Sequence, residues 1–222
     1  MLDLPEDDRA RCQLVASRLR TSVIGDILDI LDRRHQFLDA GICAVTRITC
    51  MAGRADPILI GDAFGPQPRP FGKLTEALDD LQPGDVYLAR AARTPCAAWG
   101  ELLTAAARVR KASGAVIDGY HRDTRQIEGQ DWPVFSRGAL GQDAAVRSTV
   151  LDYRIPIILG SVHVSPGDLV VGDLDGVVVV PREIEDEVLE RALKKVELEQ
   201  EVRTAIESGV STTEAFALYG VL

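Results

Sequence analysis

The residues best suited to chemistry lie in one short stretch, Trp99–Asp123. Arg122 carries a planar fork of donors that fits a carboxylate or a 2-oxo acid. The adjacent Asp123 offers a hard oxygen ligand to Mg²⁺ or Mn²⁺, metals that commonly keep several waters, and Glu101 could hold one of those waters. These residue types therefore suit a site that binds an anionic ligand beside a divalent cation.

The same stretch also offers backbone donors, because a helix is expected to begin at Gly100. The amides of Gly100, Glu101, Leu102 and Leu103 could hold a carboxylate at the helix N-terminus, and Gly100 permits close approach. Such a site suits a reaction that passes through the enolate of a bound 2-oxo acid. The metal would act as a Lewis acid, Arg122 would stabilise the same charge, and a metal-held water could take up the hydroxyl proton.

Each of these residues also has a purely structural interpretation. An adjacent Arg and Asp are commonly a surface ion pair or a loop anchor. His121 could be catalytic or could face the other way on an extended segment. Asp118 is most simply a turn residue, and Arg137 is either a second anion contact or a surface charge.

The elements that position the stretch follow from its pattern. Helix formers with apolar residues at three- and four-residue spacings run from Gly100 to Ala112, and Ser113-Gly114 ends them. Ala115–Ile117 is a short apolar strand, and Asp118-Gly119 turns the chain towards Arg122 and Asp123.

The first half of the chain is expected to be mixed. Thr21-Ser22 can cap a helix through Asp32, residues 42–52 favour one or two strands, and residues 53–73, with four prolines and four glycines, favour a loop. A helix over 74–81 and a strand over 86–89 follow. Arg54, Arg69 and Lys73 could supply cations for a second substrate carboxylate, or none of them faces the site.

The second half predicts short strands and then helices. Strands are expected at 133–136, 155–159 and 162–164, and residues 166–181 predict a hairpin whose valines are buried on both faces. Asp173 and Asp175 are interpreted as residues of its turn and not as the start of a calcium-binding loop, because the later ligands of such a loop are missing. A charged amphipathic helix is expected over 184–208, followed by a short helix capped at Ser211.

Composition restricts the class of protein. The formal charge of −9 works against sequence-independent binding of nucleic acid, and the basic residues Arg108–Lys111 are better explained as a solvated helix face. Cys12, Cys43, Cys50 and Cys96 form no metal or redox motif, so buried free thiols are expected. The acidic N-terminus lacks an apolar segment and no run is long enough to span a membrane, which predicts a cytoplasmic protein.

Four sequence blocks resemble, in order, those of the RraA-like family: WGELL, GAVIDGYHRD, PVFSRG and SPGDLVVGDLDGVVVVP. This family includes class II 4-hydroxy-4-methyl-2-oxoglutarate (4-carboxy-4-hydroxy-2-oxoadipate) aldolases. The resemblance spans roughly residues 20 to 210. It implies an α/β fold, a ββα sandwich similar to the swivelling phosphohistidine domain with a long C-terminal helix, assembled as a homotrimer or homohexamer. We expect one domain over 1–222, with an N-terminal arm (1–19) and a C-terminal helical segment (182–222).

The resemblance also implies roles for individual residues. Gly100, Glu101, Leu102 and Leu103 match the turn that binds substrate, Arg122 the arginine that binds pyruvate, and Asp123 the aspartate that binds metal. Glu101 stands where aldolases often carry an aspartate that holds metal waters. Glu199 or Glu201 corresponds to a glutamate that a neighbouring subunit contributes.

The function implied is that of a divalent-metal-dependent lyase. It would cleave a 4-hydroxy-2-oxo acid such as 4-hydroxy-4-methyl-2-oxoglutarate to pyruvate and a carbonyl product, with oxaloacetate decarboxylation as a side activity. The alternative is a non-catalytic RraA-like regulator that binds a ribonuclease or another protein. Because a regulator need not keep the metal aspartate, the presence of Arg122, Asp123 and Glu101 favours the enzyme.

Overall fold

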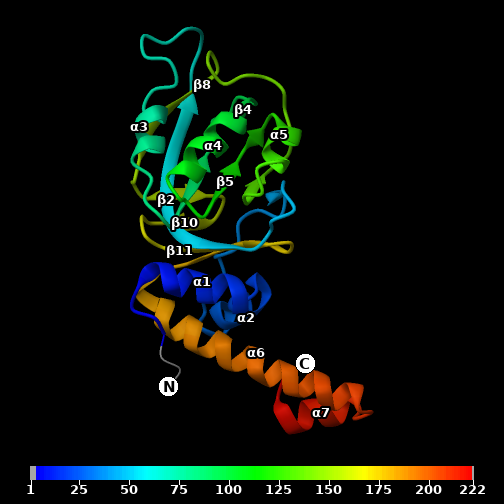
Figure 1. Cartoon of the computed structure of the whole chain (residues 1–222). Coiled ribbons are helices and arrows are strands. Elements are labelled where there is room, and N and C mark those ends of the chain that lie inside the picture. Colours follow the sequence, from blue (N-terminus) through cyan, green and yellow to red (C-terminus); the bar gives the residue numbers. More distant parts are fainter. Residues whose placement is uncertain (1–3, 222) are drawn as a thin grey trace.

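The longest strand, β2 (Met51–Asp62), occupies a stretch that the sequence predicts to be mostly loop. The computed structural model describes residues 4–221, and in it β2 runs through the centre of the sheet (Figure 1). Pro57 is tolerated because of its place in the ladder. On one edge, β2 pairs with the strand at residues 169–173 as far as Arg54, and with the strand at residues 148–153 from Ile58 onward. Pro57 lies between these two ladders, so neither of them needs an N–H at this position.

The main sheet mixes parallel and antiparallel pairs. Its order is β1 (Cys43–Ala44), β7 (Val134–Ser136), β5 (Gly114–Asp118), β3 (Asp85–Arg90), β2, β11 (Leu169–Asp173) and β12 (Gly176–Val180). β8 (Ser148–Tyr153) pairs with the second half of β2. The strands β2, β3, β5 and β7 are mutually parallel. Two small sheets complete the fold: β9 (Ile157–Leu159) with β10 (Val162–Val164), and β4 (Ala97–Trp99) with β6 (Tyr120–His121).

The helices form two groups. One group, over the core that contains Trp99 and Trp132, comprises α3 (Leu74–Asp79), α4 (Glu101–Val109) and α5 (Thr124–Glu128). Against β11, β12 and the first half of β2 lie α1 (Asp8–Arg18), α2 (Thr21–Ile30) and α6 (Glu185–Glu207), which follows a 3₁₀ turn at Arg182–Ile184. α6 extends past the rest of the molecule, and α7 (Thr212–Tyr219) folds back along it (Figure 1).

Three apolar cores hold these layers together. One lies beneath α3, α4 and α5 and contains Tyr87, Trp99 and Trp132. A second lies between the sheet and α1, α2 and α6. The third lies between the main sheet and the β9–β10 hairpin. Each buried Val, Leu or aromatic side chain contributes about 1.5–3 kcal/mol relative to exposure, so the sheet is stabilised from all three sides.

The hairpin over 166–181 is confirmed, and so is the burial of its valines on both faces. Val178 and Val180 point into the core beneath α1, α2 and α6, whereas Val177 and Val179 point into the core beside β9–β10. This alternation is the period-two pattern of a strand covered on both faces. The mixed α/β class and the long C-terminal helix are confirmed as well.

Several local predictions are wrong. Thr21 does not cap α2; it is the first helical residue, and its hydroxyl and amide both donate to Asp173. Cys43 and Cys50 are exposed, while Cys12 and Cys96 are buried as expected. The helix α1 and the strand β8 were not predicted, because neither has a clear amphipathic or alternating pattern. Among residues 4–221, no helix is both long and apolar enough to cross a membrane.

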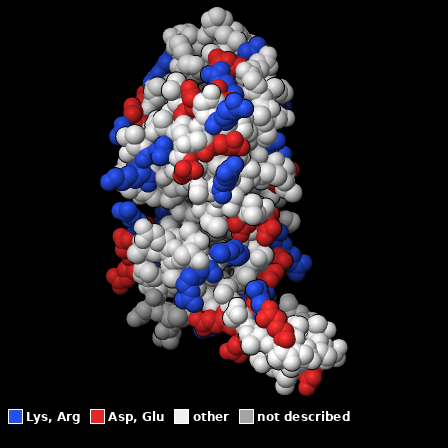
Figure 2. Space-filling model, turned by 45° about the vertical axis from the view of Figure 1, so that its right-hand side comes forward, with Lys and Arg blue, Asp and Glu red and all other residues white. Residues whose placement is uncertain are grey.

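The charged side chains are interspersed in sign on the face seen in Figure 2. Arg108, Arg110 and Lys111 are exposed, and Arg110 forms an ion pair with Asp79 of α3 (2.7 Å). The basic cluster is therefore solvated, as its sequence predicts, but it lies at the C-terminal end of α4, whose last residue is Val109.

Candidate active site

Segments distant in sequence enclose a cavity of about 530 Å³ beside the N-terminus of α4. They are the loop before α3, α3 itself, the β4–α4 junction, the β6–α5 junction and the loop after β7. Its lining residues are Phe71, Leu74, Thr75, Leu78, Ala97, Ala98, Trp99, Gly100, Glu101, Leu102, Leu103, Arg122, Asp123, Asp143 and Ala144. Every residue that the sequence assigns to the turn, the arginine and the aspartate therefore faces one space.

The pairing of two short strands brings these residues together. β4 and β6 run parallel, so the residues that follow them emerge at the same edge. The Arg122 amide donates to the Trp99 carbonyl (3.0 Å), which fixes the junction. Arg122 and Asp123, just after β6, consequently lie beside Gly100 and Glu101, just after β4.

Asp123 has an unusual backbone conformation. Its φ of 60° and ψ of 38° place it in the left-handed region at the start of α5. An L-residue pays about 1 kcal/mol there, although aspartate tolerates the region better than most. Backbone strain of this kind is common where a side chain must be held in one functional direction.

The carboxylate of Asp123 is only partly satisfied. Oδ2 accepts from the Glu101 amide (3.3 Å) and lies 3.7 Å from Nε of Arg122. Among residues 4–221, Oδ1 has no hydrogen bond or ion pair. Asp123 therefore uses one of the helix-terminal amides itself and presents a second oxygen to the cavity. The amides of Leu102 and Leu103 precede the first intrahelical bond, from Thr104 N to Gly100 O (3.1 Å).

Gly100 is required by space rather than by torsion. Its φ of −166° is extended backbone that any residue adopts. A Cβ built on it would lie 2.8 Å from Oδ2 of Asp123, closer than real contacts allow. The absence of a side chain at Gly100 therefore lets the carboxylate reach the end of α4.

The first turn of α4 is anchored from below. Nε1 of Trp99 donates to Oγ1 of Thr104 (2.8 Å), and that hydroxyl donates to the Gly100 carbonyl (3.0 Å). The Trp99 ring packs against Tyr87 and stacks on Trp132, with ring centroids 4.8 Å and 6.2 Å away. Trp99 and Thr104 are both almost fully buried, so the cavity floor is rigid.

Asp143 is a site residue that the sequence analysis missed. Its Oδ1 lies 2.9 Å from Nη1 of Arg122, whereas Asp123 lies nearest to Nε of the same guanidinium. Asp143 lies in a loop of mixed composition, GQDAAVR, which carries no periodic pattern or motif. Only the three-dimensional path of this loop, whose Gln142 carbonyl accepts from the Ala97 amide (2.8 Å), brings it to Arg122.

His121 is buried beneath the junction rather than open to the cavity. Its Nδ1 lies 2.6 Å from Oγ of Ser136 and its Nε2 lies 2.9 Å from Oγ1 of Thr124. Burial lowers the pKa of the imidazole below its ordinary value, which favours the neutral ring. This arrangement supports the structural alternative for His121, a residue that ties β7 to the start of α5.

Glu101 lines the cavity and is partly exposed. Its carbonyl accepts from Nε2 of Gln130 (3.0 Å). Its carboxylate has no hydrogen bond or ion pair within residues 4–221. The side chain can therefore turn towards Asp123 or towards solvent.

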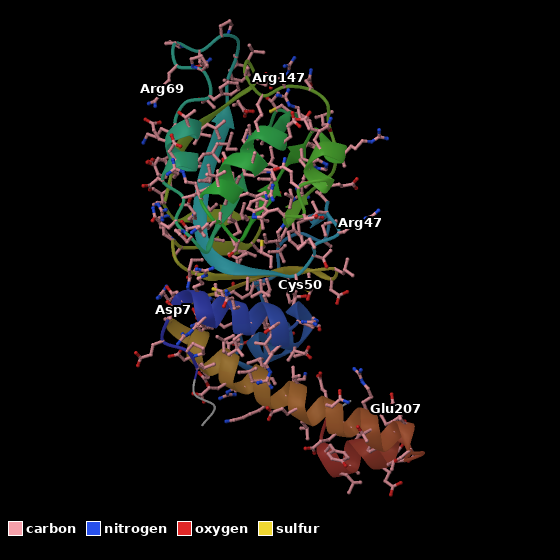
Figure 3. All side chains as sticks on the ribbon, in the orientation of Figure 1. Asp7, Arg47, Cys50, Arg69, Arg147 and Glu207 are labelled. Atoms are coloured by element: carbon pink, nitrogen blue, oxygen red, sulfur yellow. The ribbon has the colours of Figure 1, made fainter. Side chains whose placement is uncertain are left out.

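Other candidate residues lie away from this cavity. Arg54 is buried between Glu185 and Asp8, so it does not supply a cation to the cavity. Lys73 pairs with Asp152 (2.8 Å), and Arg69 pairs with Glu76 and lies at the outer end of the molecule (Figure 3). Arg137 is held by Asp118 (2.5 Å) and Asp39 (3.0 Å). Glu199 and Glu201 lie on α6, outside the cavity lining.

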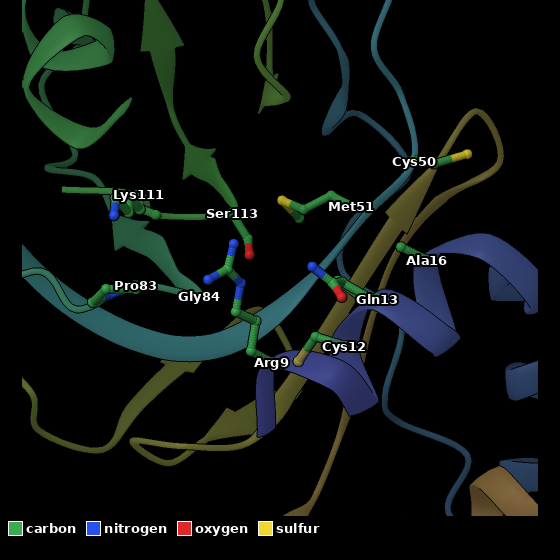
Figure 4. A pocket seen from close by; sticks show the side chains of 12 residues that line it. Arg9, Cys12, Gln13, Ala16, Cys50, Met51, Pro83, Gly84, Lys111 and Ser113 are labelled. Carbon is green, nitrogen blue, oxygen red and sulfur yellow. The ribbon is translucent and has the colours of Figure 1, made fainter. Parts of the chain in front are cut away.

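Two further cavities lack the same donor set. One of about 290 Å³ lies between α1 and the start of β2, where Arg9 and Gln13 face Ser113 (Figure 4), and no carboxylate from residues 4–221 lines it. Another, of about 780 Å³, contains His35 and His163. Its cations are partly committed, because Arg34 pairs with Asp32 (3.0 Å) and Arg182 with Asp8 (3.3 Å). The cavity at α4 is the better candidate.

The donors at the N-terminus of α4 fit a divalent cation that has few protein ligands. Within residues 4–221, no three His, Cys, Asp or Glu side chains cluster as a ligand set. Asp123 offers an unpartnered carboxylate oxygen, and Glu101 lies on the same wall of the cavity. A hard cation that keeps most of its waters matches this arrangement.

Fold and site together define an α/β protein with a cavity where a helix N-terminus meets an Arg-Asp pair. The profile of the RraA-like family (Aldolase/RraA) matches residues 21–179, and the chain belongs to this family. The match covers the sheet, the cavity and both turns that carry the candidate residues.

Individual relatives are similar over different shares of their lengths. A Halalkalibacterium halodurans protein named "Putative 4-hydroxy-4-methyl-2-oxoglutarate aldolase" is 34% identical over 143 residues, 64% of this chain and 67% of that protein. Other curated relatives match over 20% to 65% of their own lengths.

Solved structures with the same fold carry diverse descriptions. One, described as "novel cellulases from microbes associated with the gut ecosystem", has a TM-score of 0.81 at 30% identity and covers 90% of this chain and 89% of that chain. RraAS2 of Streptomyces coelicolor, described as an unusual member of the RNase ES inhibitor RraA family, has a TM-score of 0.77 at 26% identity, covering 87% and 96%. Function must therefore be argued from the site.

Proposed function

We propose that this chain is a divalent-metal-dependent lyase that cleaves a 4-hydroxy-2-oxo acid to pyruvate and a carbonyl product. The observation that carries the proposal is the convergence of the Gly100–Leu103 turn, Arg122 and Asp123 on one cavity. The relatives named as aldolases at 34% and 31% identity support it. The substrate class we favour is 4-hydroxy-4-methyl-2-oxoglutarate, with decarboxylation of oxaloacetate as a side activity.

The proposed roles follow from the positions of the side chains. Arg122 binds the carboxylate of the 2-oxo acid and stabilises the negative charge that develops on the neighbouring oxygen. The amides of Leu102 and Leu103 add donors and the positive end of the α4 dipole. Asp123 would hold Mg²⁺ or Mn²⁺, with Glu101 ordering its waters, and the cation would supply a Lewis acid for the carboxylate and keto oxygens.

Breaking the carbon–carbon bond also requires removal of the hydroxyl proton of the aldol. The Glu101 carboxylate lines the cavity and has no partner among residues 4–221, so it can order a water that accepts this proton. His121 is not assigned this role, because both of its ring nitrogens face hydroxyl groups inside the protein.

The assembly is also part of the proposal. α6 extends beyond the other elements and could reach a neighbouring subunit in a homotrimer or homohexamer (Figure 1). Glu199 or Glu201 would then add a carboxylate to the neighbour's cavity. The likeness to the swivelling phosphohistidine domain and a cytoplasmic location remain predictions of the sequence analysis.

The test is pyruvate release from 4-hydroxy-4-methyl-2-oxoglutarate and from oxaloacetate, with Mg²⁺, Mn²⁺ or EDTA. The wild type is compared with Asp123→Ala and with Asp79→Asn, a variant in an exposed ion pair of α3. We expect metal-dependent turnover that Asp123→Ala abolishes and Asp79→Asn preserves. Turnover that persists in EDTA, or in Asp123→Ala, would contradict the proposal.

A second candidate function is a regulator that binds a ribonuclease or another protein. The similarity to RraAS2 over 87% of this chain favours it. Absence of turnover of both substrates under every metal, together with retention of a purified ribonuclease on the immobilised chain, would select this alternative.

A further inference from the structure

We propose that Asp143 is an internal competitor for the substrate carboxylate at Arg122. The inference rests on the proposed use of Arg122 as the group that binds a carboxylate. Asp143 approaches Nη1 of Arg122 to 2.9 Å, and Asp123 lies 3.7 Å from Nε of the same guanidinium. An incoming carboxylate that approaches Nη1 on the side of Asp143 competes with Asp143 for this donor.

The contact between Asp143 and Arg122 is built into the loop rather than left to a mobile side chain. Oδ2 of Asp143 accepts from the Ala145 amide (3.1 Å), which orients the carboxylate. The Asp143 carbonyl accepts from Nη1 of Arg147 (3.0 Å). One residue earlier, Gln142 is bonded to Ala97 in β4. The backbone on both sides therefore holds Asp143 against the cavity.

The charge balance gives the contact its consequence. One guanidinium lies between two carboxylates, so the group as a whole carries a net negative charge before any ligand arrives. The proposed divalent cation at Asp123 offsets that charge, so what remains for a carboxylate that replaces Asp143 at Nη1 is to compensate for the lost Arg122–Asp143 attraction. The side chains of Arg122 and Asp143 are each 42% exposed, so the attraction is modest and can be exchanged.

The consequence for specificity is a threshold. A simple monocarboxylate gains at Arg122 about what Asp143 gives up, so it binds poorly. A 2-oxo acid adds contacts through its keto oxygen and through the amides at the end of α4. Asp143 therefore lowers the affinity of every carboxylate by the same factor. Only ligands that make these further contacts still bind with appreciable affinity.

The experiment measures binding by titration calorimetry with pyruvate and with acetate, both in Mg²⁺. Asp143→Asn keeps the size of the side chain and removes its charge. We expect both ligands to bind three- to tenfold more tightly to Asp143→Asn than to the wild type, with the ratio between them preserved. We expect KM for oxaloacetate to fall by a similar factor, with kcat changed less than twofold.

Two variants serve as controls. Asp79→Asn removes the same charge from the exposed pair with Arg110, and we expect it to bind as the wild type does. Arg122→Ala should lose pyruvate binding by at least tenfold. A thermal unfolding curve for each variant identifies losses caused by misfolding.

Several results would overturn the inference. They are unchanged or weaker binding to Asp143→Asn, equal tightening in Asp79→Asn, and wild-type pyruvate binding by Arg122→Ala. If no variant turns over substrate but Asp143→Asn still binds pyruvate more tightly, the lyase proposal fails and the competitor role of Asp143 stands.

Discussion

Arg54 and Arg122 each lie between two carboxylates, but their surroundings differ. Arg54 is 8% exposed and joins β2 to α6 through Glu185 and to α1 through Asp8. The side chain of Arg122 is 42% exposed and borders a cavity. Burial by itself raises the pKa of Asp8, yet the Arg54 guanidinium outweighs it and holds that pKa below its usual value. A buried pair of this kind connects elements, whereas an open pair can exchange partners.

The comparison shows that a cluster of charges does not by itself mark a site. Both clusters combine arginine with Asp or Glu, and the sequence offers both Arg54 and Arg122 as anion-binding candidates. Two features distinguish the site: exposure to a cavity, and a carboxylate oxygen of Asp123 that no residue within 4–221 binds.

The largest effect is expected from a substitution in the open cluster, which consists of Arg122, Asp123 and Asp143. Arg122→Lys replaces a planar fork by a point charge, so we expect turnover of the 2-oxo acid to fall about a thousandfold, or about 4 kcal/mol in transition-state stabilisation. The free energy of unfolding should change by less than about 0.5 kcal/mol, because the pairs of Arg122 are exposed. Steady-state kinetics and urea unfolding measure the two quantities. A loss of stability large enough to explain the loss of activity would contradict the conclusion that the Arg122 pairs serve function and not stability.

The next effect breaks the buried cluster. Glu185→Gln leaves the Arg54 charge without its buried partner, so we expect a loss of about 3 kcal/mol in the free energy of unfolding. Turnover per folded molecule should stay within twofold of the wild type. Glu187→Gln, in an exposed pair with Arg191 on the same helix, is the control and should cost about 0.3 kcal/mol. Equal destabilisation by both substitutions would refute the distinction between buried and exposed pairs.

A third carboxylate extends the comparison, because Asp56 is buried and neither of its oxygens has a hydrogen-bond partner among residues 4–221. Burial raises the pKa of this carboxyl to about 7, although Arg154 lies 3.7 Å away. The unfolded chain releases this proton near pH 4, so the contribution of Asp56 to stability falls as the pH rises from about 4 to 7. Asp56→Asn should therefore gain about 3 kcal/mol over the wild type between pH 5 and pH 8. Urea unfolding at both pH values tests this, and a constant difference would exclude the shifted pKa.

The smallest effect concerns the backbone at the open cluster. Glycine adopts the left-handed conformation of Asp123 without the cost that alanine pays. We expect Asp123→Gly to be about 1 kcal/mol more stable than Asp123→Ala, while both lack turnover. The difference in thermal midpoint between the two variants reports the strain directly. Equal midpoints would show that the loop relaxes when the carboxylate is removed.

Local patterns were enough to predict the block that carries the site. The helix from Gly100 and the strand at Ala115–Ile117 depend on helix formers and an apolar run that follow one another along the chain. The expected turn at Asp118-Gly119 is reduced to a bend at Gly119, because Asp118 continues β5 opposite Arg90. The hairpin at 166–181 was predicted for the same reason. The roles proposed for Gly100, Glu101, Arg122 and Asp123 stay predictions, but their positions around one cavity agree with them.

The parts that were missed depend on contacts between distant residues. β2 contains Pro57 and two glycines and is a strand only because β3, β8 and β11 supply partners at the right registers. Asp143 belongs to the site only because its loop bonds to β4. Arg54 lies away from the site because it forms an ion pair with Glu185, which is distant in sequence. Secondary-structure propensity and residue spacing contain no information about these tertiary contacts.

The central position of β2 also determines when the fold can form during synthesis. Its first half needs β11, which leaves the ribosome more than a hundred residues later, whereas β3 follows β2 closely. The side of the sheet that carries α3, α4 and α5 can therefore assemble early, while the apolar faces of α1 and α2 that pack on β11, β12 and α6 stay uncovered until the last third of the chain is made. A nascent chain arrested before residue 169 should expose this apolar surface and bind chaperones until the hairpin arrives.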